Sequence, residues 1–314
     1  VGRPSRRERV GGVGRRPASG LDGILLVDKD ANWTSHDVVA RVRGITRQPR
    51  AGHTGTLDPL ATGLLVVCLG KATRLVEYMV GHDKRYEGVI QLGVRTDTDD
   101  AAGQEVERRD VGEGWRERLD ELAGRFSGEQ EQTPPAYSAI SVGGRRAYEI
   151  ARQGGTPALR ARRVTVHELR LAALAEDQVA IALHCGAGTY VRSLARDIGE
   201  ALGCGAHLAQ LRRTAAGPFK VEEAWTIDEL VALAEHDLME QAMLPPDEGV
   251  RELGAALVTE EHARALASGV RIMAAGGAGG AAGVARIYGR GGGFVGMGEV
   301  GAEGQIRAKK VISA

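Results

Sequence analysis

The stretch GHTGTLDPLATG, residues 52–63, combines three glycines, three threonines, one histidine and one proline with a single acid, Asp58. A carboxylate in such a turn-rich segment can act as a nucleophile or as a general base. It can equally cap a helix, because Asp followed by Pro at the first helical position is a common helix start. The twelve residues alone leave both interpretations open.

Two further segments resemble metal-binding motifs, and both depart from them at ligand positions. DTDDAAG, residues 97–103, begins like a calcium loop, but Ala101 stands where the loop needs a ligand. Cys204 and His207 are ligand types for structural zinc, yet no second pair of ligands accompanies them. We therefore expect no bound metal ion.

Charge is balanced over the chain but segregated along it. The 314 residues include 41 basic and 41 acidic residues. Residues 1–16 hold six arginines and one glutamate, and residues 144–170 hold seven arginines and two glutamates, whereas residues 222–262 hold twelve acids and one arginine. A local basic stripe is enough to bind a polyanion, so this pattern favours nucleic acid as the partner. Solvated arginines on helix surfaces are the plainer alternative.

Cysteine usage and hydropathy indicate the compartment. The three cysteines, Cys68, Cys185 and Cys204, are widely spaced and form no CxxC pair, which is typical of a reducing compartment. No run of eighteen apolar residues occurs, and the arginine-rich start lacks the apolar core of a secretory signal. We therefore expect a cytoplasmic protein with no membrane partner.

The hydrophobic pattern predicts the elements that must position these groups. GILLV, residues 23–27, predicts a short apolar strand, and TSHDVVARVRGI, residues 34–45, has helical spacing behind a Thr/Ser start. VAIALHC (179–185) alternates as a strand does, and LARDIGEALG (194–203) predicts an amphipathic helix ended by Gly203. Strands and helices mix without a strict βαβ rhythm, which favours an α+β fold.

Composition shifts divide the chain into three parts. Residues 1–20, rich in Gly, Arg and Pro, predict a disordered basic leader. An acidic stretch, 221–243, predicts helix, and LPPDEG, 244–249, is typical of a domain boundary. We therefore expect one large domain, residues 21–250, followed by a small, glycine-rich and loop-rich β unit in residues 251–314.

Five segments then occur together and in one order. They are DKDANWTSHDVV, GHTGTLDPLATGLLVVCLGKATR, KRYEGVIQLGVRTDTDDAAG, QTPPAYSAISVGGRRAYEIARQG and CGAGTYVRSLARDIGEALGCGAHLAQLRRTAAGPF. With them the chain resembles the bacterial TruB family of pseudouridine synthases, which isomerise the uridine at position 55 in the T loop of transfer RNA. The resemblance runs from about Gly23 to Phe219 and weakens after Trp225, where the family carries a small RNA-binding PUA domain.

This resemblance implies a fold and a reaction. The fold is a pseudouridine-synthase core on a mixed, mainly antiparallel sheet with flanking helices, followed by a PUA-like domain in residues 251–314. The implied substrate is tRNA, bound through its T stem-loop by a monomeric enzyme. No cofactor is implied, because the isomerisation oxidises nothing and adds no group.

By resemblance, Asp58 is the catalytic carboxylate, acting as nucleophile or as base. Arg192 corresponds to the arginine that pairs with it, and a guanidinium fork would keep the carboxylate ionised and aimed. Tyr190 lies two residues earlier, so in extended backbone both side chains would project to one face. A tyrosine with its hydroxyl tied up in the core is the alternative for Tyr190.

The same resemblance implies that further residues contact the RNA. Tyr86 corresponds to the aromatic residue that stacks on the flipped uracil, with a strand-surface tyrosine as the alternative. His53 matches a histidine near the everted nucleotide, with a structural histidine as the alternative, and Leu211 matches an apolar residue of the uracil pocket. Lys29 and the arginines of residues 144–163 are expected to contact the phosphate backbone.

The chain departs from the family's first motif, in which the lysine is usually followed by proline and, two residues later, by glycine. Asp30 and Asn32 stand at these positions. Asn tolerates a left-handed backbone, so the turn can persist, but Asp30 places an acid beside Lys29. Arg212 and Arg213 follow Leu211 near the end of the matched segments. A pair of solvated surface arginines is the plain interpretation of these two residues.

Two other functions are compatible with these residues. A non-catalytic RNA-binding or RNA-folding module on the same scaffold would bind tRNA without product, although the intact GTLDP and GTYVR segments argue against it. A dyskerin-type relative would modify RNA only with partner proteins and a guide RNA. Incubation of the protein alone with unmodified tRNA separates the three.

Overall fold

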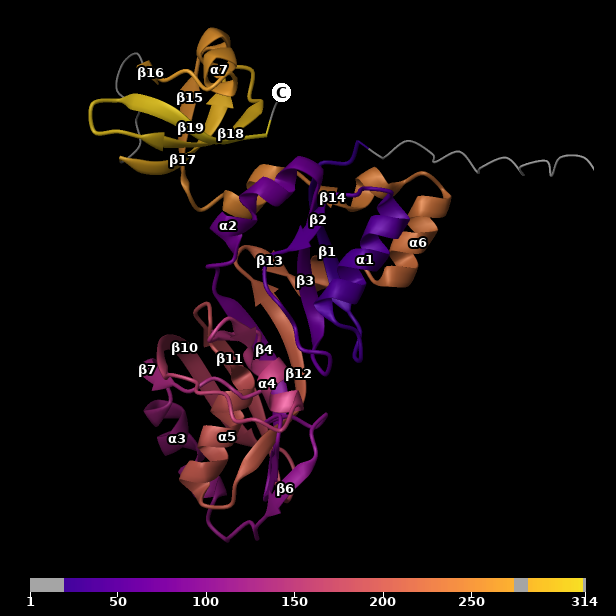
Figure 1. Ribbon diagram of the computed structural model, residues 1–314, viewed down its shortest axis with the longest axis vertical. Helices are drawn as coiled ribbons and strands as arrows, with labels where there is room; N and C mark the ends of the chain where they lie inside the picture. Colours follow the sequence, from indigo (N-terminus) through magenta and orange to yellow (C-terminus); the bar gives the residue numbers. More distant parts are fainter. Residues whose placement is uncertain (1–19, 274–281, 313–314) are drawn as a thin grey trace, which may run out of the picture.

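The computed structural model describes residues 20–273 and 282–312 (Figure 1). The basic leader expected in residues 1–20 lies outside the described residues apart from Gly20. No helix within the described ranges is long and apolar enough to cross a membrane.

A mixed sheet of ten strands forms the body of the molecule. Its order is β14-β1-β3-β12-β4-β11-β10-β7, with β2 paired to β3 and β13 paired to β12. The strands are β1 (Gly23–Lys29), β2 (Ala51–His53), β3 (Thr62–Leu69), β4 (Lys84–Leu92), β7 (Gly128–Gln132), β10 (Arg162–Ala173), β11 (Gln178–Cys185), β12 (Ala206–Ala216), β13 (Phe219–Lys220) and β14 (Met243–Leu244). The pairings are antiparallel except that between β12 and β3. The predicted α+β class with a mainly antiparallel sheet is confirmed.

Helices and two small hairpins surround this sheet. The helices are α1 (Ser35–Thr46), α2 (Val76–Met79), α3 (Leu119–Arg125), α4 (Ala147–Arg152), α5 (Val191–Leu202) and α6 (Ile227–Glu235); 3-10 segments span Gly70–Leu75, Arg116–Arg118, Val221–Glu223, Met239–Ala242 and Pro246–Val250. The hairpins pair β5 (Val94–Thr96) with β6 (Glu105–Arg108) and β8 (Ser141–Val142) with β9 (Arg145–Arg146). In Figure 1, α3 and α5 lie beside β10, β11 and β12, while α1 and α6 lie beside β1.

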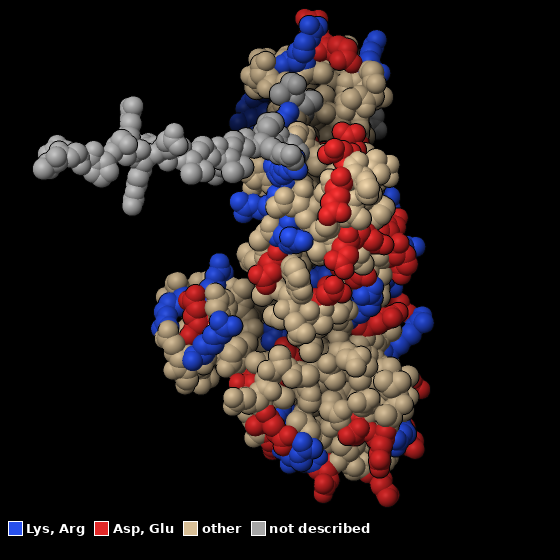
Figure 2. All heavy atoms as spheres, turned by 90° about the vertical axis from the view of Figure 1, so that its right-hand side faces the viewer, with Lys and Arg blue, Asp and Glu red and all other residues tan. Residues whose placement is uncertain are grey.

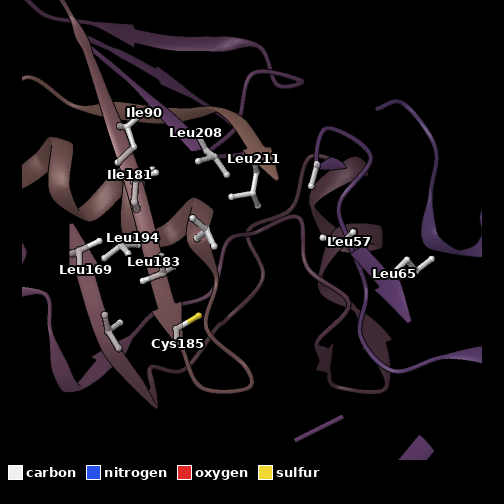
Figure 3. Close-up of a cluster of buried hydrophobic side chains, with 14 of the residues drawn as sticks. Leu57, Leu65, Ile90, Leu169, Ile181, Leu183, Cys185, Leu194, Leu208 and Leu211 are labelled. Carbon is white, nitrogen blue, oxygen red and sulfur yellow. The ribbon is translucent and has the colours of Figure 1, made fainter. Parts of the chain in front are cut away.

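The apolar run that predicted the first strand is buried on both faces. Leu25 of β1 and Leu65 of β3 belong to one core cluster, and Leu26 and Leu64 belong to the other. Side chains alternate between the faces of a strand, so a continuous apolar run is what such a strand needs. Figure 3 shows part of the first cluster, where Leu57 and Leu65 lie across from side chains of β4, β11 and β12.

The predicted helices form, with one difference in extent. Thr34 caps α1 and shares a capping box with Asp37, and Gly203 ends α5 in a left-handed conformation. The acidic stretch 221–243, predicted to be helical, is helical only in α6 and in short 3-10 segments. Between the 3-10 segment Val221–Glu223 and α6 the chain is extended, because the backbone of Trp225 hydrogen-bonds to β1.

A second sheet of five strands follows, with the order β15-β17-β18-β19-β16. Its elements are β15 (Gly254–Val258), α7 (Glu260–Ala267), β16 (Ile272–Met273), β17 (Gly283–Gly289), β18 (Phe294–Val300) and β19 (Gln305–Val311). The small β unit predicted for the end of the chain is therefore present. Met297 and Ile312 pack into the second core cluster of the main sheet, and Lys310 pairs with Glu77 of α2 at 2.6 Å.

Candidate active site

A cleft of about 560 Å³ opens over the middle of the main sheet. Its lining comes from segments far apart in the sequence: Thr56, Leu57, Asp58, Pro59, Tyr86, Thr98, Asp100, Ala102, Tyr137, Ser138, Ala139, Tyr148, Arg152, Thr189, Tyr190, Val191, Arg192 and Leu211. A concave site with an apolar wall and a few convergent polar groups is the usual form of a binding site for a small group or a base.

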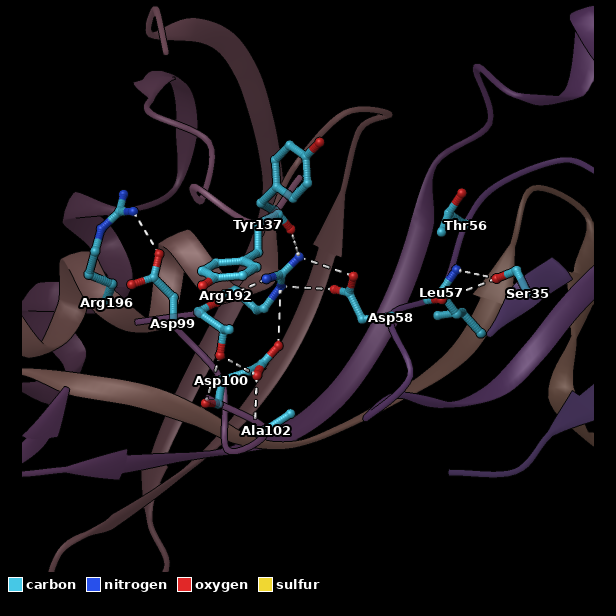
Figure 4. Close-up of polar contacts among 12 residues, drawn as sticks. Ser35, Thr56, Leu57, Asp58, Asp99, Asp100, Ala102, Tyr137, Arg192 and Arg196 are labelled. Atoms are coloured by element: carbon cyan, nitrogen blue, oxygen red, sulfur yellow. Dashed lines mark hydrogen bonds and ion pairs between the residues drawn. The ribbon is translucent and has the colours of Figure 1, made fainter. Parts of the chain in front are cut away.

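Asp58 lies in the segment between β2 and β3 and begins no helix, so the helix-cap interpretation is wrong. The neighbouring Leu57 is buried, and its backbone N–H donates to the Ser35 hydroxyl at 2.8 Å while its carbonyl accepts from that hydroxyl at 3.1 Å (Figure 4). The carboxylate of Asp58 remains 35% exposed and points into the cleft. The buried anchor beside it fixes where the carboxylate stands.

Arg192 holds this carboxylate in a bidentate pair. Its Nε donates to Oδ2 of Asp58 at 2.9 Å and its Nη2 donates to Oδ1 at 3.0 Å (Figure 4). The guanidinium, only 5% exposed, also donates to the carbonyls of Thr98 and Tyr137. Because two parallel bonds hold the carboxylate and two further bonds hold the guanidinium itself, the orientation of the Asp58 carboxylate is strongly fixed.

The backbone around Arg192 differs from the extended form expected from its spacing to Tyr190. Arg192 lies in the first turn of α5, and Tyr190 is the extended residue that precedes this helix. The backbone of Tyr190 exchanges two hydrogen bonds with the Gln132 side chain. Both Tyr190 and Arg192 nevertheless line the cleft.

Two acids that the sequence did not single out complete the charge network. Asp100 is buried, lies 3.6 Å from Nε of Arg192 and accepts from Ala102 N–H at 3.0 Å. Asp99 pairs with Arg196 at 2.9 Å, and burial raises the pKa of Asp99 although Arg196 opposes the shift. The acidic segment DTDD was the sequence feature that could have indicated these partners. Two of its acids lie beside the arginines of α5.

Tyr86 and Leu211 form an apolar wall of the cleft from two paired strands. Tyr86 of β4 is half-buried, and burial raises the pKa of its phenol. Leu211 of β12 is buried opposite Gly88, two residues beyond Tyr86. An aromatic ring and an aliphatic side chain at one wall can hold a planar base.

Arg213 is buried and does not belong to a solvated pair, so that interpretation is wrong for this residue. It is 2% exposed, and its guanidinium donates to the carbonyls of Leu64 at 2.6 Å, Gly55 at 3.1 Å and Thr56 at 3.5 Å. Arg212 is partly exposed and pairs with Asp28. Arg213 thus holds the chain just before Asp58.

Lys29 lies on the other side of the same segment and is fully buried. Its ammonium donates to the carbonyls of Asp30, Trp33 and Pro59, and burial lowers its pKa to about 8 although Asp58 and Asp30 oppose the shift. The expectation that Lys29 contacts an RNA phosphate does not fit this position. Asn32 adopts the predicted left-handed backbone, and its N–H donates to the carbonyl of Pro59.

His53 stands apart from the cleft lining. It is half-buried on β2, its ring packs edge-on against His36 with centroids 5.7 Å apart, and burial lowers its pKa. Within the described residues its Nδ1 has no hydrogen-bond partner. The structure therefore places His53 beside the Asp58 segment rather than in the cleft.

The arginines of residues 144–163 do not form one class. Arg162 lies 4.6 Å over the ring of Tyr190, a residue of the cleft, and donates to the carbonyl of Gly188. Arg160 and Arg163 are exposed. These two present their charge to solvent in the manner expected for contact with a polyanion.

Comparison with known proteins agrees with the fold over nearly the whole chain. Family models match residues 43–191 (TruB family pseudouridylate synthase, N-terminal domain), 192–251 (tRNA pseudouridylate synthase B C-terminal domain) and 255–312 (pseudouridine synthase II TruB, C-terminal). Solved structures with a similar fold include an H/ACA RNP bound to a substrate RNA containing 2′-deoxyuridine (27% identity, TM-score 0.72) and a Cbf5–Nop10–Gar1 complex (28%, 0.71), each covering 93% of this chain and 85% of the other.

Curated relatives agree with the family models. A tRNA pseudouridine synthase B of Ectopseudomonas mendocina is 40% identical over 295 residues, which cover 93% of this chain and 95% of that relative. The protein of the same name from Thermobifida fusca is 50% identical over 224 residues, which cover 67% and 75%. The chain therefore belongs to the TruB family of pseudouridylate synthases.

Proposed function

We propose that this chain is an enzyme that forms pseudouridine in tRNA and that Asp58 is its catalytic group. The observation that carries the proposal is the partly exposed Asp58 carboxylate, aimed into the cleft by its bidentate pair with Arg192. The names of the relatives, which match over most of their length, support tRNA as the substrate.

The chemistry requires little beyond such a carboxylate. The N1–C1′ bond of uridine breaks, the uracil turns, and a C5–C1′ bond forms while the proton of C5 is lost and N1 gains one. Substrate and product are isomers, so the balance needs neither an oxidant nor a group donor. A carboxylate can serve as the nucleophile or as the base in this sequence.

The walls of the cleft suit a base that has left its stack. A nucleotide inside a folded loop must be flipped out before its glycosidic bond can be reached, and stacking on an aromatic face offsets part of that cost. We assign the stacking face to Tyr86 and the apolar wall to Leu211, with Tyr190 at the rim. We propose that His53 contacts the RNA next to the flipped nucleotide.

Lys29 has a different role in this proposal. Together with Arg213 it anchors the backbone on both sides of Asp58 through carbonyl hydrogen bonds. It acts on the position of the carboxylate and makes no contact with RNA.

We further propose the finer points of specificity and organisation. The target is uridine 55 of the T stem-loop, the enzyme acts as a monomer without partner proteins, and residues 21–250 form the catalytic domain. Residues 251–314 form a PUA-like RNA-binding domain that grips the tRNA away from the target base.

One experiment tests the reaction, its target and its independence of partner proteins. The purified chain is incubated alone with an unmodified tRNA transcript, and pseudouridine is mapped along the RNA; a matched transcript with cytidine at position 55 is the control. We expect one pseudouridine at position 55 and none in the control. Binding without product would support the non-catalytic module, and product only after addition of a guide ribonucleoprotein would support a guide-dependent enzyme.

A further inference from the structure

Three side chains with metal-ligand atoms meet on the surface outside the cleft. Nε2 of His167 lies 3.2 Å from Oδ2 of Asp83, and Nε2 of His184 lies 3.8 Å from the same oxygen. The two imidazole rings are 4.7 Å apart, and one ligand atom of each residue lies within 4.8 Å of the others. Two imidazole nitrogens and a carboxylate oxygen therefore converge on one point.

The fold brings these residues together from two neighbouring strands and from the residue just before a third. Asp83 immediately precedes β4, His184 is on β11, and His167 is on β10, and these strands lie side by side in the sheet (Figure 1). The register between β10 and β11 shifts between Val166 and Glu168, so His167 sits at a bulge. A bulge re-aims a side chain that regular pairing would direct elsewhere.

The backbone of the cluster is held independently of any ligand. Gly217 N–H donates to the carbonyl of Asp83 at 2.9 Å, and Gly186 N–H donates to the carbonyl of Thr165 at 2.8 Å, beside the bulge. The nearby Glu168 is paired with Arg85 and Arg170, so its charge is already balanced. The backbone at Asp83 and beside the bulge is therefore fixed without a ligand, and the neighbouring Glu168 carboxylate is occupied by arginines.

We propose that Asp83, His167 and His184 bind a divalent transition metal ion, with zinc as the best-fitting example. Imidazole nitrogen and carboxylate oxygen are ordinary zinc ligands at about 2.0–2.2 Å, and tetrahedral geometry at that distance separates ligand atoms by about 3.4 Å. The 3.2 and 3.8 Å separations from the Asp83 oxygen bracket this value, and all three ligand atoms lie within 4.8 Å of one another, so side-chain rotations would complete the site.

The exposure of the ligands sets the character of the site. Asp83, His167 and His184 are 49%, 37% and 24% exposed, which leaves room for water at the remaining coordination position. The ion would cross-link β4, β11 and β10 and stabilise the folded state. It lies outside the cleft lining and takes no part in the isomerisation.

The sequence excluded this site because its ligands are dispersed. The three residues are separated by 84 and 17 positions (167 − 83 and 184 − 167) and match no spaced motif. The simpler alternative is an ion pair between Asp83 and a protonated His167, with His184 as a neighbour. That arrangement binds no metal.

Zinc titration of the full chain, freed of metal by chelation and dialysis, tests the proposal. Calorimetry should show one zinc ion per chain, and zinc should raise the thermal midpoint in proportion to the logarithm of its concentration above Kd. His167→Gln and Asp83→Asn should each weaken zinc binding by about tenfold or more and reduce the shift of the thermal midpoint at every zinc concentration. Magnesium, which prefers oxygen ligands, should not compete.

His36→Gln is the matched control, because His36 and His53 form a second pair of neighbouring histidine rings. We expect this variant to bind zinc as the wild type does. Circular dichroism of the metal-free His167→Gln and Asp83→Asn chains checks that they are folded, since both changes are at exposed positions. Absence of zinc binding in the wild type, or binding lost in His36→Gln but kept in His167→Gln and Asp83→Asn, would overturn the proposal.

Discussion

The main sheet and the C-terminal sheet bury different kinds of side chain. Among the described residues, every buried polar or charged side chain lies between Lys29 and Arg213, including Arg192 and Asp100. The C-terminal core cluster consists of apolar residues such as Leu266, with its charged side chains outside it. Both kinds of interior fold, but only the first contains a network of charges around a cleft.

The buried charges of the main sheet have a role other than stability. An ammonium or guanidinium loses hydration on burial, and its partners often only compensate for that loss, so apolar residues would stabilise the fold at least as well. The burial of Lys29 and Arg213 is therefore best explained by the Asp58 segment that they hold. On the surface, Lys and Arg are interspersed with Asp and Glu over the face in Figure 2, so charge there is far less organised than in the cleft.

Apart from replacement of Asp58 itself, the largest expected effect comes from Arg192→Lys, which keeps the positive charge but removes the planar guanidinium that makes two parallel bonds. A lysine cannot make two parallel bonds to Asp58 while also donating to Thr98 and Tyr137, so the carboxylate loses its fixed orientation. We expect kcat on tRNA to fall by about 100-fold or more. Arg41→Lys, at an exposed position of α1, is the control and should leave single-turnover rates unchanged.

Removal of the residues from Arg251 onward tests the role of the C-terminal sheet. If the C-terminal sheet only grips RNA, KM should rise by roughly tenfold, equivalent to about 1.4 kcal/mol of uniform binding, and kcat should fall less. The thermal midpoint should also fall, because Met297 and Ile312 leave the core cluster that they share with the main sheet. A fall in kcat at unchanged KM would contradict this division of roles.

Neighbouring arginines of β12 provide a sharper and smaller test. Arg213→Met removes the donor that Arg213 provides to the carbonyls of Leu64, Gly55 and Thr56 and should lower the free energy of unfolding by about 3 kcal/mol. Arg212→Met removes a partly exposed pair with Asp28 and should cost less than about 1 kcal/mol. Denaturant unfolding of the two variants measures the difference. Equal losses of unfolding free energy would contradict the prediction that the buried arginine stabilises the fold more than the surface arginine.

The smallest effect concerns the exposed arginines. Arg160→Gln combined with Arg163→Gln should reduce the slope of log affinity for tRNA against log salt by about 2, because each arginine is expected to neutralise one phosphate. Arg170→Gln is the matched control, because Arg170 is exposed but already paired with Glu168 at 2.5 Å. Filter binding at several salt concentrations distinguishes them. An unchanged slope in the double variant would make these ordinary surface arginines.

The sequence predicted the elements better than the contacts between them. A short apolar run predicted β1, helical spacing with a Thr/Ser start predicted α1, and Gly203 predicted the end of α5, because these signals are local. The pairing of Asp58 with Arg192 came from the resemblance alone, since 134 positions separate the two residues. Spacing suggested extended backbone at Arg192, where the structure has the first turn of a helix.

Burial was the harder property to predict. Arg212 and Arg213 are adjacent and chemically identical, yet β12 directs one to solvent and the other into the core. Lys29 was predicted to contact the phosphate backbone, whereas the carbonyls of Asp30, Trp33 and Pro59 surround its ammonium. Such outcomes depend on which segments pack against a strand, and one sequence does not contain that information locally.

The central claim is that the Asp58 carboxylate performs the chemistry, and Asp58→Asn tests it most directly. Asparagine keeps the size of the side chain and one oxygen for Arg192 but removes the charge and the nucleophile. The measurement is single-turnover pseudouridine formation at position 55, with the Kd for tRNA and the thermal midpoint taken on the same preparation. We predict a rate lower by more than about 10³-fold with nearly unchanged Kd and midpoint. A stable Asp58→Asn chain that forms pseudouridine at the wild-type rate would contradict the account.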